Sequence, residues 1–191
     1  MDCRTYFNDL ADGWDARCAP HPELLETVAF LSGARPSLRV LDIACGTGAM
    51  FPALLDQGVE RLVGIDVAEK MAAVASAKFA SNSRVEVRCG DFYALKSEPF
   101  HAALLYNAYP HFLDKEALFA KAASLLLPGG RFTIAHSMGR EALNAHHGNV
   151  PASVCAPLSP AAEEVRRWEP WFHVDMLCDS ADFYLLSGVK R

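Results

Sequence analysis

Residues 39–50 read RVLDIACGTGAM, a hydrophobic segment that runs directly into a turn with two glycines. The first five residues suit a buried strand. Gly46 and Gly48 lack a Cβ, so the backbone there can turn sharply and let a ligand approach closely. Asp42 places a carboxylate beside the turn. In open parallel sheets ligands bind outside the carboxyl ends of the strands, so this stretch predicts both a sheet and a ligand site.

Around this stretch, apolar runs alternate with helical segments, as in a parallel sheet that is covered on both faces. The tail differs, because residues 172–180 and 181–190 are separated only by a turn and predict an antiparallel hairpin at the sheet edge. The expected fold is therefore α/β, with a doubly wound, mostly parallel seven-stranded sheet and helices on both faces. We expect strands at 38–44, 61–67, 85–91, 101–107 and 131–137, and helices at 4–17, 21–32, 49–58, 68–80 and 114–127.

At 191 residues the chain fits one domain, residues 1–191. We expect residues 1–35 to form an N-terminal helical cap. Residues 139–158 form a longer connection than usual, and loops above roughly 12–15 residues are usually functional or disordered, so we expect a substrate loop there. The charged residues of the following segment are expected on a solvated helix face: Glu163, Glu164, Arg166 and Arg167.

Composition excludes several classes of function. The net charge of −5 gives no support to a nucleic-acid surface, because phosphate binding needs clustered Lys and Arg. No apolar run approaches the roughly 18 residues of a membrane span, so no membrane partner is expected. The polar, acidic N-terminus is unlike a secretory signal. Six scattered cysteines without a CxxC pair favour free thiols and a cytoplasmic location.

The glycine turn does not fit two common nucleotide motifs. A dinucleotide fingerprint needs a third glycine where this chain has Phe51, and a P-loop needs a Gly-Lys-Ser/Thr ending that is absent. The first departure counts against an NAD-dependent oxidoreductase. The carboxylate of Asp42 would repel a pyrophosphate and attract a cation. The turn therefore suits a nucleoside that carries positive charge.

From about Tyr6 to the last strand, the chain resembles the class I S-adenosylmethionine-dependent methyltransferases. LDIACGTG resembles the first motif of that family, although Ala44 stands where many members have glycine. GIDVAEKM resembles the second motif, and CGDFYAL the third. YNAYPHF occupies the place of the active-site loop, and PGGRFTIAH resembles the turn and strand that follow. Each motif is weak alone, but the order and spacing of all five are specific.

The resemblance implies a Rossmann-like methyltransferase fold and S-adenosylmethionine as cofactor. It implies that Asp66 holds the ribose hydroxyls, that Met71 packs on the adenine, and that Asp91 accepts from the adenine amino group while Phe92 flanks the ring. The full set of cofactor-binding residues predicted in this way is Asp42, Ala44, Cys45, Gly46, Gly48, Asp66, Val67, Met71, Gly90, Asp91, Phe92 and Asn107.

The expected reaction is in-line transfer of a methyl group to a small-molecule acceptor. His111 and His136 follow the fourth and fifth strands, on the side where an acceptor should lie, and are the candidates for a catalytic base. The histidine spacing fits no zinc pattern, so no metal is predicted. Residues predicted on the substrate side are Tyr6, Trp14, Tyr109, Asn144, His146 and His147.

Three questions stay open from the sequence. The acceptor atom is undetermined, and an acceptor that is already ionised needs no base. A non-catalytic protein of the same fold that binds S-adenosylmethionine or S-adenosylhomocysteine would keep the same binding motifs. The oligomeric state, monomer or homodimer, is not defined by the sequence.

Overall fold

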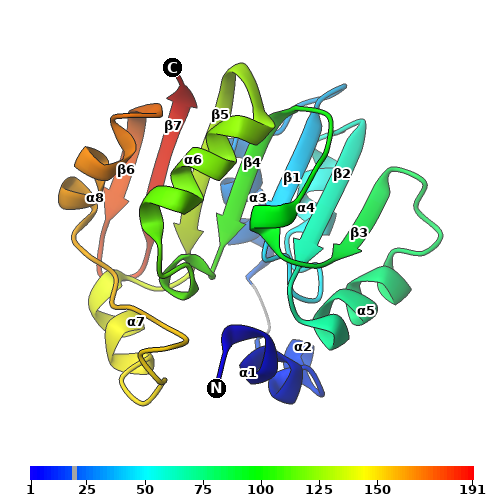
Figure 1. The fold of residues 1–191 in the computed structure, drawn as a ribbon. Helices are drawn as coiled ribbons and strands as arrows, with labels where there is room; N and C mark the ends of the chain where they lie inside the picture. The colour runs from blue at the N-terminus through cyan, green and yellow to red at the C-terminus, as the bar shows by residue number, and fades with distance from the viewer. Residues whose placement is uncertain (19–20) are drawn as a thin grey trace.

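A seven-stranded sheet forms the centre of the chain, of which the computed structural model describes residues 1–18 and 21–191 (Figure 1). The strand order is β3-β2-β1-β4-β5-β7-β6, in which β7 is antiparallel to both of its neighbours and the other pairs are parallel. The predicted fold class is confirmed. The strands are β1 (Arg39–Ile43), β2 (Arg61–Asp66), β3 (Val85–Cys89), β4 (Phe100–Tyr106), β5 (Leu126–His136), β6 (Phe172–Asp179) and β7 (Tyr184–Lys190).

Helices cover both faces of this sheet, as Figure 1 shows for α6 on one face and α3 and α4 on the other. They are α1 (Cys3–Leu10), α2 (Trp14–Arg17), α3 (Pro22–Leu31), α4 (Phe51–Asp56), α5 (Glu69–Lys78), α6 (Lys115–Leu125), α7 (Arg140–His146) and α8 (Ala161–Trp168), with short 3-10 helices η1 (Phe92–Ala94) and η2 (Tyr109–His111).

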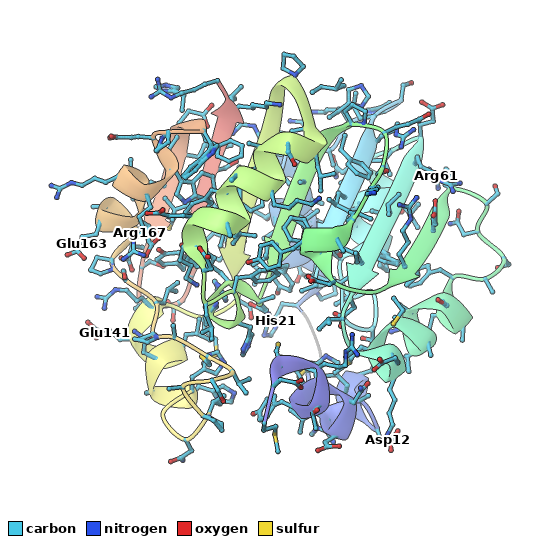
Figure 2. All side chains as sticks on the ribbon, viewed as in Figure 1. Asp12, His21, Arg61, Glu141, Glu163 and Arg167 are labelled. Carbon is cyan, nitrogen blue, oxygen red and sulfur yellow. The ribbon has the colours of Figure 1, made fainter. Side chains whose placement is uncertain are left out.

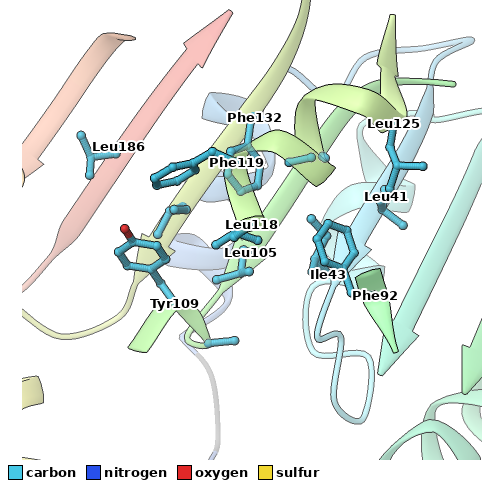
Figure 3. Packing of buried hydrophobic residues seen from close by; sticks show 14 of the residues in the cluster. Leu41, Ile43, Phe92, Leu105, Tyr109, Leu118, Phe119, Leu125, Phe132 and Leu186 are labelled. Atoms are coloured by element: carbon cyan, nitrogen blue, oxygen red, sulfur yellow. The ribbon is translucent and has the colours of Figure 1, made fainter. Parts of the chain in front are cut away.

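Two hydrophobic clusters hold these layers together. One joins the sheet to α6 and α8 through the fully buried Phe119, Phe132 and Trp168, and Figure 3 shows Phe119 and Phe132 facing each other between α6 and the sheet. The rings of Phe132 and Trp168 stack with centroids 5.1 Å apart. The other cluster joins the sheet to α3 and α4 through residues such as Val28 and Phe51. Strand residues that face alternate sides supply both clusters, which explains why the strands read as continuous apolar runs.

The strand order reverses direction between β1 and β4, which lie side by side although β2 and β3 intervene in the sequence. Open α/β sheets bind ligands at such a reversal, outside the carboxyl ends of the strands. The residues that follow β1 and β4 here are the glycine turn and the segment leading to η2. The fold therefore places the predicted site where its topology favours one.

Several predicted elements differ in detail. The helix expected over 4–17 is broken into α1 and α2, because Gly13 adopts a left-handed conformation with φ 70°. The helix expected over 114–127 ends at Leu125, and β5 already begins at Leu126. The C-terminal hairpin is present, but its second strand lies inside the sheet and its first strand at the edge.

The charged segment 163–167 lies in α8 and is only partly solvated. Glu163 and Arg167 are exposed, and Figure 2 shows them on the outside of α8. Glu164, predicted to be solvated, is instead 2% exposed and packs toward α6 and η2. Helical periodicity turns one residue of such a charged run toward the core, and this residue needs a buried partner. Within the described residues, no helix is long and apolar enough to cross a membrane.

Candidate functional site

The glycine turn after β1 contains three residues with left-handed backbone, Ala44 at φ 55°, Gly46 at φ 55° and Gly48 at φ 83°. A Cβ built on Gly48 would lie 3.0 Å from ring atoms of Phe51 and Phe79, so the packing of the fold requires glycine there. A Cβ on Gly46 would meet nothing within 4 Å. Gly48 is therefore required by the packing of the fold, whereas Gly46 leaves open space in which a ligand can approach the backbone.

Asp66, at the end of β2, fixes this turn. Its Oδ2 accepts a hydrogen bond from the Gly46 N–H and its Oδ1 accepts one from the Ala68 N–H, both at 2.8 Å. Burial raises the pKa of Asp66, although these backbone donors oppose the shift. Each carboxylate oxygen has a second acceptor position, so Asp66 can still accept from ligand hydroxyls. It is both a structural part of the turn and a possible ligand contact.

Asp42 lies beneath the turn, within β1. It is 2% exposed, and burial together with the neighbouring Asp66 raises its pKa well above the usual value. A buried carboxylate without a cationic partner favours its protonated form. Cys45 is also buried, and its pKa is raised well above normal, mainly by burial. Asp42 and Cys45 are thus the buried residues beneath the turn. A cationic ligand bound there would lower the pKa of Asp42.

The helices α1 and α2 form a cap beside the glycine turn, whereas α3, expected within the same cap of residues 1–35, packs on the sheet instead. Phe7 and Trp14 pack against Met71 and Ala68 at the start of α5, with the rings of Phe7 and Trp14 5.8 Å apart. Figure 1 shows α1 and α2 below the carboxyl ends of the strands, beside α5. Tyr6 is half-buried and contacts Phe7 at 5.2 Å between ring centroids. Of the predicted residues, Tyr6, Trp14 and Met71 therefore meet in one region.

Polar contacts fasten this cap at the molecular surface. Asp15 accepts from the Thr47 hydroxyl at 2.6 Å and from the Lys78 ammonium at 2.8 Å, which lowers the pKa of Asp15. Asn8 donates to the Glu69 carboxylate at 2.6 Å. Exposed ion pairs such as that between Lys78 and Asp15 contribute little stability each, so the packing of Phe7 and Trp14 on Met71 contributes more to holding the cap. Thr47 and Asp15 were not predicted, although Thr47 lies between the two glycines.

After β3 the chain presents one acidic side chain. Gly90 donates its N–H to the Asp66 carbonyl at 2.8 Å, which brings this segment next to the glycine turn. Asp91 is exposed, and its Oδ1 accepts from the Tyr93 N–H at 2.9 Å. The ring of Phe92 belongs to the hydrophobic core, where it meets Phe112 at 6.0 Å. Asp91 is thus available to a ligand, whereas Phe92 is first a core residue.

Asn107 follows β4 with a left-handed backbone at φ 54°. Its side chain donates to the Ser137 hydroxyl at 3.0 Å and accepts from the Ser137 N–H at 2.8 Å. This pair joins the ends of β4 and β5 beside the turn after β1. Asn107 is exposed, so it is accessible as well as structural. Val67, in the corresponding place after β2, is half-buried between Asp66 and the start of α5.

His111 lies at the end of η2 and contacts both the cap and the segment 139–158. Its Nδ1 is 3.0 Å from the carbonyl oxygen of Val154, and its ring meets Phe7 of the cap at 4.9 Å and His147 at 5.2 Å. Burial lowers the pKa of His111 to about 4, with His147 and Lys115 contributing. Because a carbonyl can only accept, Nδ1 carries the proton and Nε2 is a free acceptor.

His136, the last residue of β5, is fully buried. Neither ring nitrogen has a hydrogen-bond partner among residues 1–18 and 21–191, and the ring stands edge-on to Tyr184 with 6.1 Å between centroids. Burial lowers the pKa of His136 to about 3, and nearby His111 and His147 add to the shift. A buried polar group without a partner is rare and costly. Of the predicted residues, His111 and His147 are brought into ring contact, whereas His136, predicted as a catalytic base, is enclosed in the core.

Two residues predicted on the substrate side have structural roles instead. Tyr109 is fully buried in the core (Figure 3), where its hydroxyl donates to Glu164 at 2.5 Å. The Lys115 ammonium lies 3.7 Å from the Tyr109 ring centroid and donates to the Tyr109 carbonyl. Asn144 donates to the Leu158 carbonyl at 3.0 Å and accepts from the Leu158 N–H at 2.7 Å, which closes the 139–158 segment.

These corrections have a simple geometric cause. Tyr109 and His111 flank Pro110 in one 3-10 turn, and only His111 faces the cap. His146 is exposed, whereas His147 turns inward and its Nδ1 lies 3.3 Å from Sγ of Cys155. Cys155 was not predicted, because a lone cysteine in a loop carries no pattern. Across the described residues, no group of three His, Cys, Asp or Glu is placed to hold a metal ion.

Surface cavities of about 510 and 330 Å³ lie at the opposite end of the sheet, away from the glycine turn. The larger is lined by Arg39 and Arg61, which begin β1 and β2, and by their ion-pair partners Glu98 and Glu86. Ligands of such sheets bind at the carboxyl ends of the strands, and exposed ion pairs are common on surfaces. We therefore assign the candidate site to the glycine turn and its cap.

Known proteins show the same fold and related sequence. Residues 40–130 match the family model described as methyltransferase domain. The ubiquinone biosynthesis O-methyltransferase of Bordetella avium is 30% identical over 116 residues, which are 59% of this chain and 48% of that protein. The chain spans about half or less of the length of the curated relatives it matches first, 31–48%.

Solved structures match over nearly the whole chain. The methyltransferase in complex with the Trm112 methyltransferase activator of Haloferax volcanii has a TM-score of 0.84 at 20% identity, over 96% of this chain and 97% of that one. The N-methyltransferase NodS of Bradyrhizobium japonicum WM9, solved with S-adenosyl-L-homocysteine, has a TM-score of 0.76 at 16% identity, over 100% and 99%. At these identities the likeness shows a shared fold.

Proposed function

We propose that the chain, whose residues 40–130 match the methyltransferase-domain model, is a class I S-adenosylmethionine-dependent methyltransferase that transfers a methyl group from S-adenosylmethionine to a small-molecule acceptor. The observation that carries the proposal is the open space at Gly46, next to the carboxylate of Asp66 that holds the same turn. A nucleoside ligand needs both close backbone approach and an acceptor for its ribose hydroxyls.

The described residues fit the cofactor part by part. The turn at Gly46 would receive the methionine portion, and the second acceptor positions of Asp66 would hold the ribose hydroxyls. Asp91, exposed at the start of η1, would accept from the adenine amino group. Met71, packed beneath Trp14, would lie against the base. When bound, the cofactor supplies a methyl group on a positively charged sulfur, which is already activated for displacement.

The work left to the protein is alignment, exclusion of water and proton removal. Holding two reactants at near-attack distance can supply about 7–11 kcal/mol of the barrier reduction. The cap and the segment 139–158 meet where the Ser153 hydroxyl donates to the Met1 carbonyl at 2.9 Å, so they can enclose the reactants together. His111, with Nε2 free, is the base that this arrangement favours.

Several features support a small acceptor. The cap and the 139–158 segment crowd the site from two sides, and relatives are named as O- and C-methyltransferases of ubiquinone biosynthesis and of a sterol. All six cysteines are free thiols, which suits the reducing cytoplasm we propose as the location. A non-catalytic binder of the same fold is the alternative. It would have no use for a base held in one tautomer beside the site.

The proposal is tested by calorimetry with S-adenosylmethionine, S-adenosylhomocysteine and NAD. We expect the first two to bind and NAD not to bind. Asp66→Ala should weaken binding by about 1.5–3 kcal/mol, the value of a hydrogen bond to a charged group. Asp182→Ala, at an exposed position in the β6–β7 turn, is the matched control and should bind normally. Unchanged affinity in Asp66→Ala would remove this residue from the site.

Turnover is tested separately. A screen with methyl-labelled cofactor over small phenols, thiols, amines and carboxylic acids should label at least one class. Cofactor binding without transfer to any of them would favour the non-catalytic alternative.

A further inference from the structure

The first turn of α5 has no capping side chain of its own. The first N–H groups of a helix lack partners within the helix, so they need acceptors from outside it. Ala68, the N-cap residue of α5, has only a methyl group as its side chain. The Ala68 N–H donates to Oδ1 of Asp66 at 2.8 Å. The N–H groups that follow it therefore depend on a residue from another part of the chain.

Asn8 of α1 supplies the missing acceptor. Its Oδ1 accepts from the Lys70 N–H at 3.0 Å, which is the bond that an N-cap side chain normally makes. Its Nδ2 donates to the Glu69 carboxylate at 2.6 Å, so both ends of the amide are used on the same helical turn. Asn8 and Lys70 are 62 residues apart in the sequence. A distant segment of the chain thus completes the start of α5.

This turn of α5 belongs to the proposed cofactor site. Asp66, which would hold the ribose hydroxyls, is bonded to the turn through the Ala68 N–H. Met71, which would lie against the adenine, is buried and directly follows Lys70. The bond from Lys70 to Asn8 therefore fixes the backbone beside Met71, at the turn that Asp66 also holds.

The cap makes a second polar contact that spans the glycine turn and α5. Oδ1 of Asp15 accepts from the Thr47 hydroxyl, between the two glycines, at 2.6 Å. Oδ2 of Asp15 accepts from the ammonium of Lys78, the last residue of α5, at 2.8 Å. Figure 1 shows α1 and α2 beside α5. A displaced cap would therefore leave the glycine turn without one contact and both ends of α5 without another.

We propose that Asn8 is a positioning residue for the cofactor, which acts through the first turn of α5 and couples cofactor binding to docking of the cap. This assignment rests on the proposed function. If the cofactor binds only to molecules with a docked cap, its apparent affinity falls with the fraction of molecules that are docked. By linkage, the bound cofactor stabilises the docked cap by the same factor.

Calorimetry with S-adenosylhomocysteine tests the role of Asn8. Asn8→Ala should weaken binding about 2- to 30-fold, which corresponds to the usual N-cap contribution of about 0.5–2 kcal/mol. Asp9→Ala, exposed on the same helix, is the matched control and should bind normally. Asn8→Asp combined with Glu69→Gln exchanges donor and acceptor in the side-chain pair and keeps an oxygen for the Lys70 N–H. This double variant should regain most of the lost affinity.

Trypsin cleavage after Arg17, which is exposed in α2, measures docking of the cap. Saturating S-adenosylhomocysteine should slow this cleavage in the wild type. Without ligand, Asn8→Ala should be cleaved faster than the wild type and Asp9→Ala at the same rate. A residue that only stabilised the fold would lower the free energy of unfolding in urea, but the affinity for S-adenosylhomocysteine would not change.

The outcomes separate this assignment from the proposed function. Equal affinity of the wild type and folded Asn8→Ala would overturn the positioning role and leave methyl transfer standing. A loss of affinity that the double variant does not regain would also overturn it, because the capping oxygen would then not be the cause. Cleavage after Arg17 that S-adenosylhomocysteine does not slow would refute the coupling. If S-adenosylhomocysteine does not bind the wild type, the proposed function fails, and the assignment fails with it.

Discussion

Replacing His136 with leucine should stabilise the protein, and by more at pH 5 than at pH 7. Leucine is close to histidine in volume and has no polar atom. At pH 7 the substitution removes two buried nitrogens without partners, whose burial costs about 1–3 kcal/mol. It also removes the edge contact with Tyr184, worth about 0.5–1.5 kcal/mol. The expected net gain is about 1 kcal/mol.

The pH dependence follows from the difference between the folded and unfolded states. Burial holds the pKa of His136 at about 3 in the folded protein, whereas an unfolded histidine titrates near 6.5. Below pH 6.5 the unfolded state binds a proton that the folded state does not, so the wild type loses stability as the pH falls. At pH 5 this loss is about 2 kcal/mol, since 1.5 pH units correspond to 1.36 kcal/mol each. The leucine variant does not have this loss of stability, because it lacks the histidine that titrates.

Urea unfolding at the two pH values measures both quantities. The stability gap between variant and wild type should widen from about 1 to about 3 kcal/mol, because His111 and His147 are present in both proteins and cancel. His173→Leu, exposed on β6, is the control and should show no widening. A gap that is equal at pH 5 and pH 7 would refute the reasoning, because it would mean that His136 keeps its proton affinity in the folded state.

Further predictions concern the turn, the cap and the core. Gly46→Ala should fold, with a loss of about 1–2 kcal/mol in the free energy of unfolding because its backbone is left-handed. In calorimetry this variant should bind S-adenosylhomocysteine at least tenfold more weakly. Gly48→Ala should lose about 2–4 kcal/mol in urea unfolding, because overpacking against Phe51 and Phe79 is added. Similar stability losses in both would contradict the division of roles. Asp15→Ala should change stability by less than about 1 kcal/mol but speed cofactor release, as followed by tryptophan fluorescence, and an unchanged release rate would mean that the cap does not gate the site. Glu164→Ala should cost about 1–3 kcal/mol because the buried Tyr109 hydroxyl loses its acceptor, and Glu164→Gln should restore most of it. Equal losses in both glutamate variants would show that the hydrogen bond is unimportant.

The sheet and the glycine turn could be predicted because their signals are local. Alternating strands and helices define a parallel sheet, and Gly46 and Asp66 occur at positions that any such sheet brings to one edge. Ala44 adopts a left-handed backbone with φ 55°, a conformation that glycine adopts without the cost of a Cβ.

The remaining errors concern the direction in which a side chain faces. Tyr109 and His111 occur in the same turn, yet one enters the core and the other faces the cap. Glu164 lies in a charged run that looks solvated, and only the packing of α8 against η2 shows that it is buried. Such orientations depend on contacts between distant segments, which no local pattern contains. The approach of the His111 and His147 rings likewise joins segments that are distant in the sequence.

The place of β7 in the sheet has a consequence for synthesis on the ribosome. β6 comes first in the chain, but it pairs only with β7, which lies between it and β5. Until residues 184–190 have left the exit tunnel, β6 has no partner and the edge of β5 is open. Unpaired strand edges readily join other chains. A nascent chain that pauses between β6 and β7 therefore exposes two strand edges to pairing with other chains.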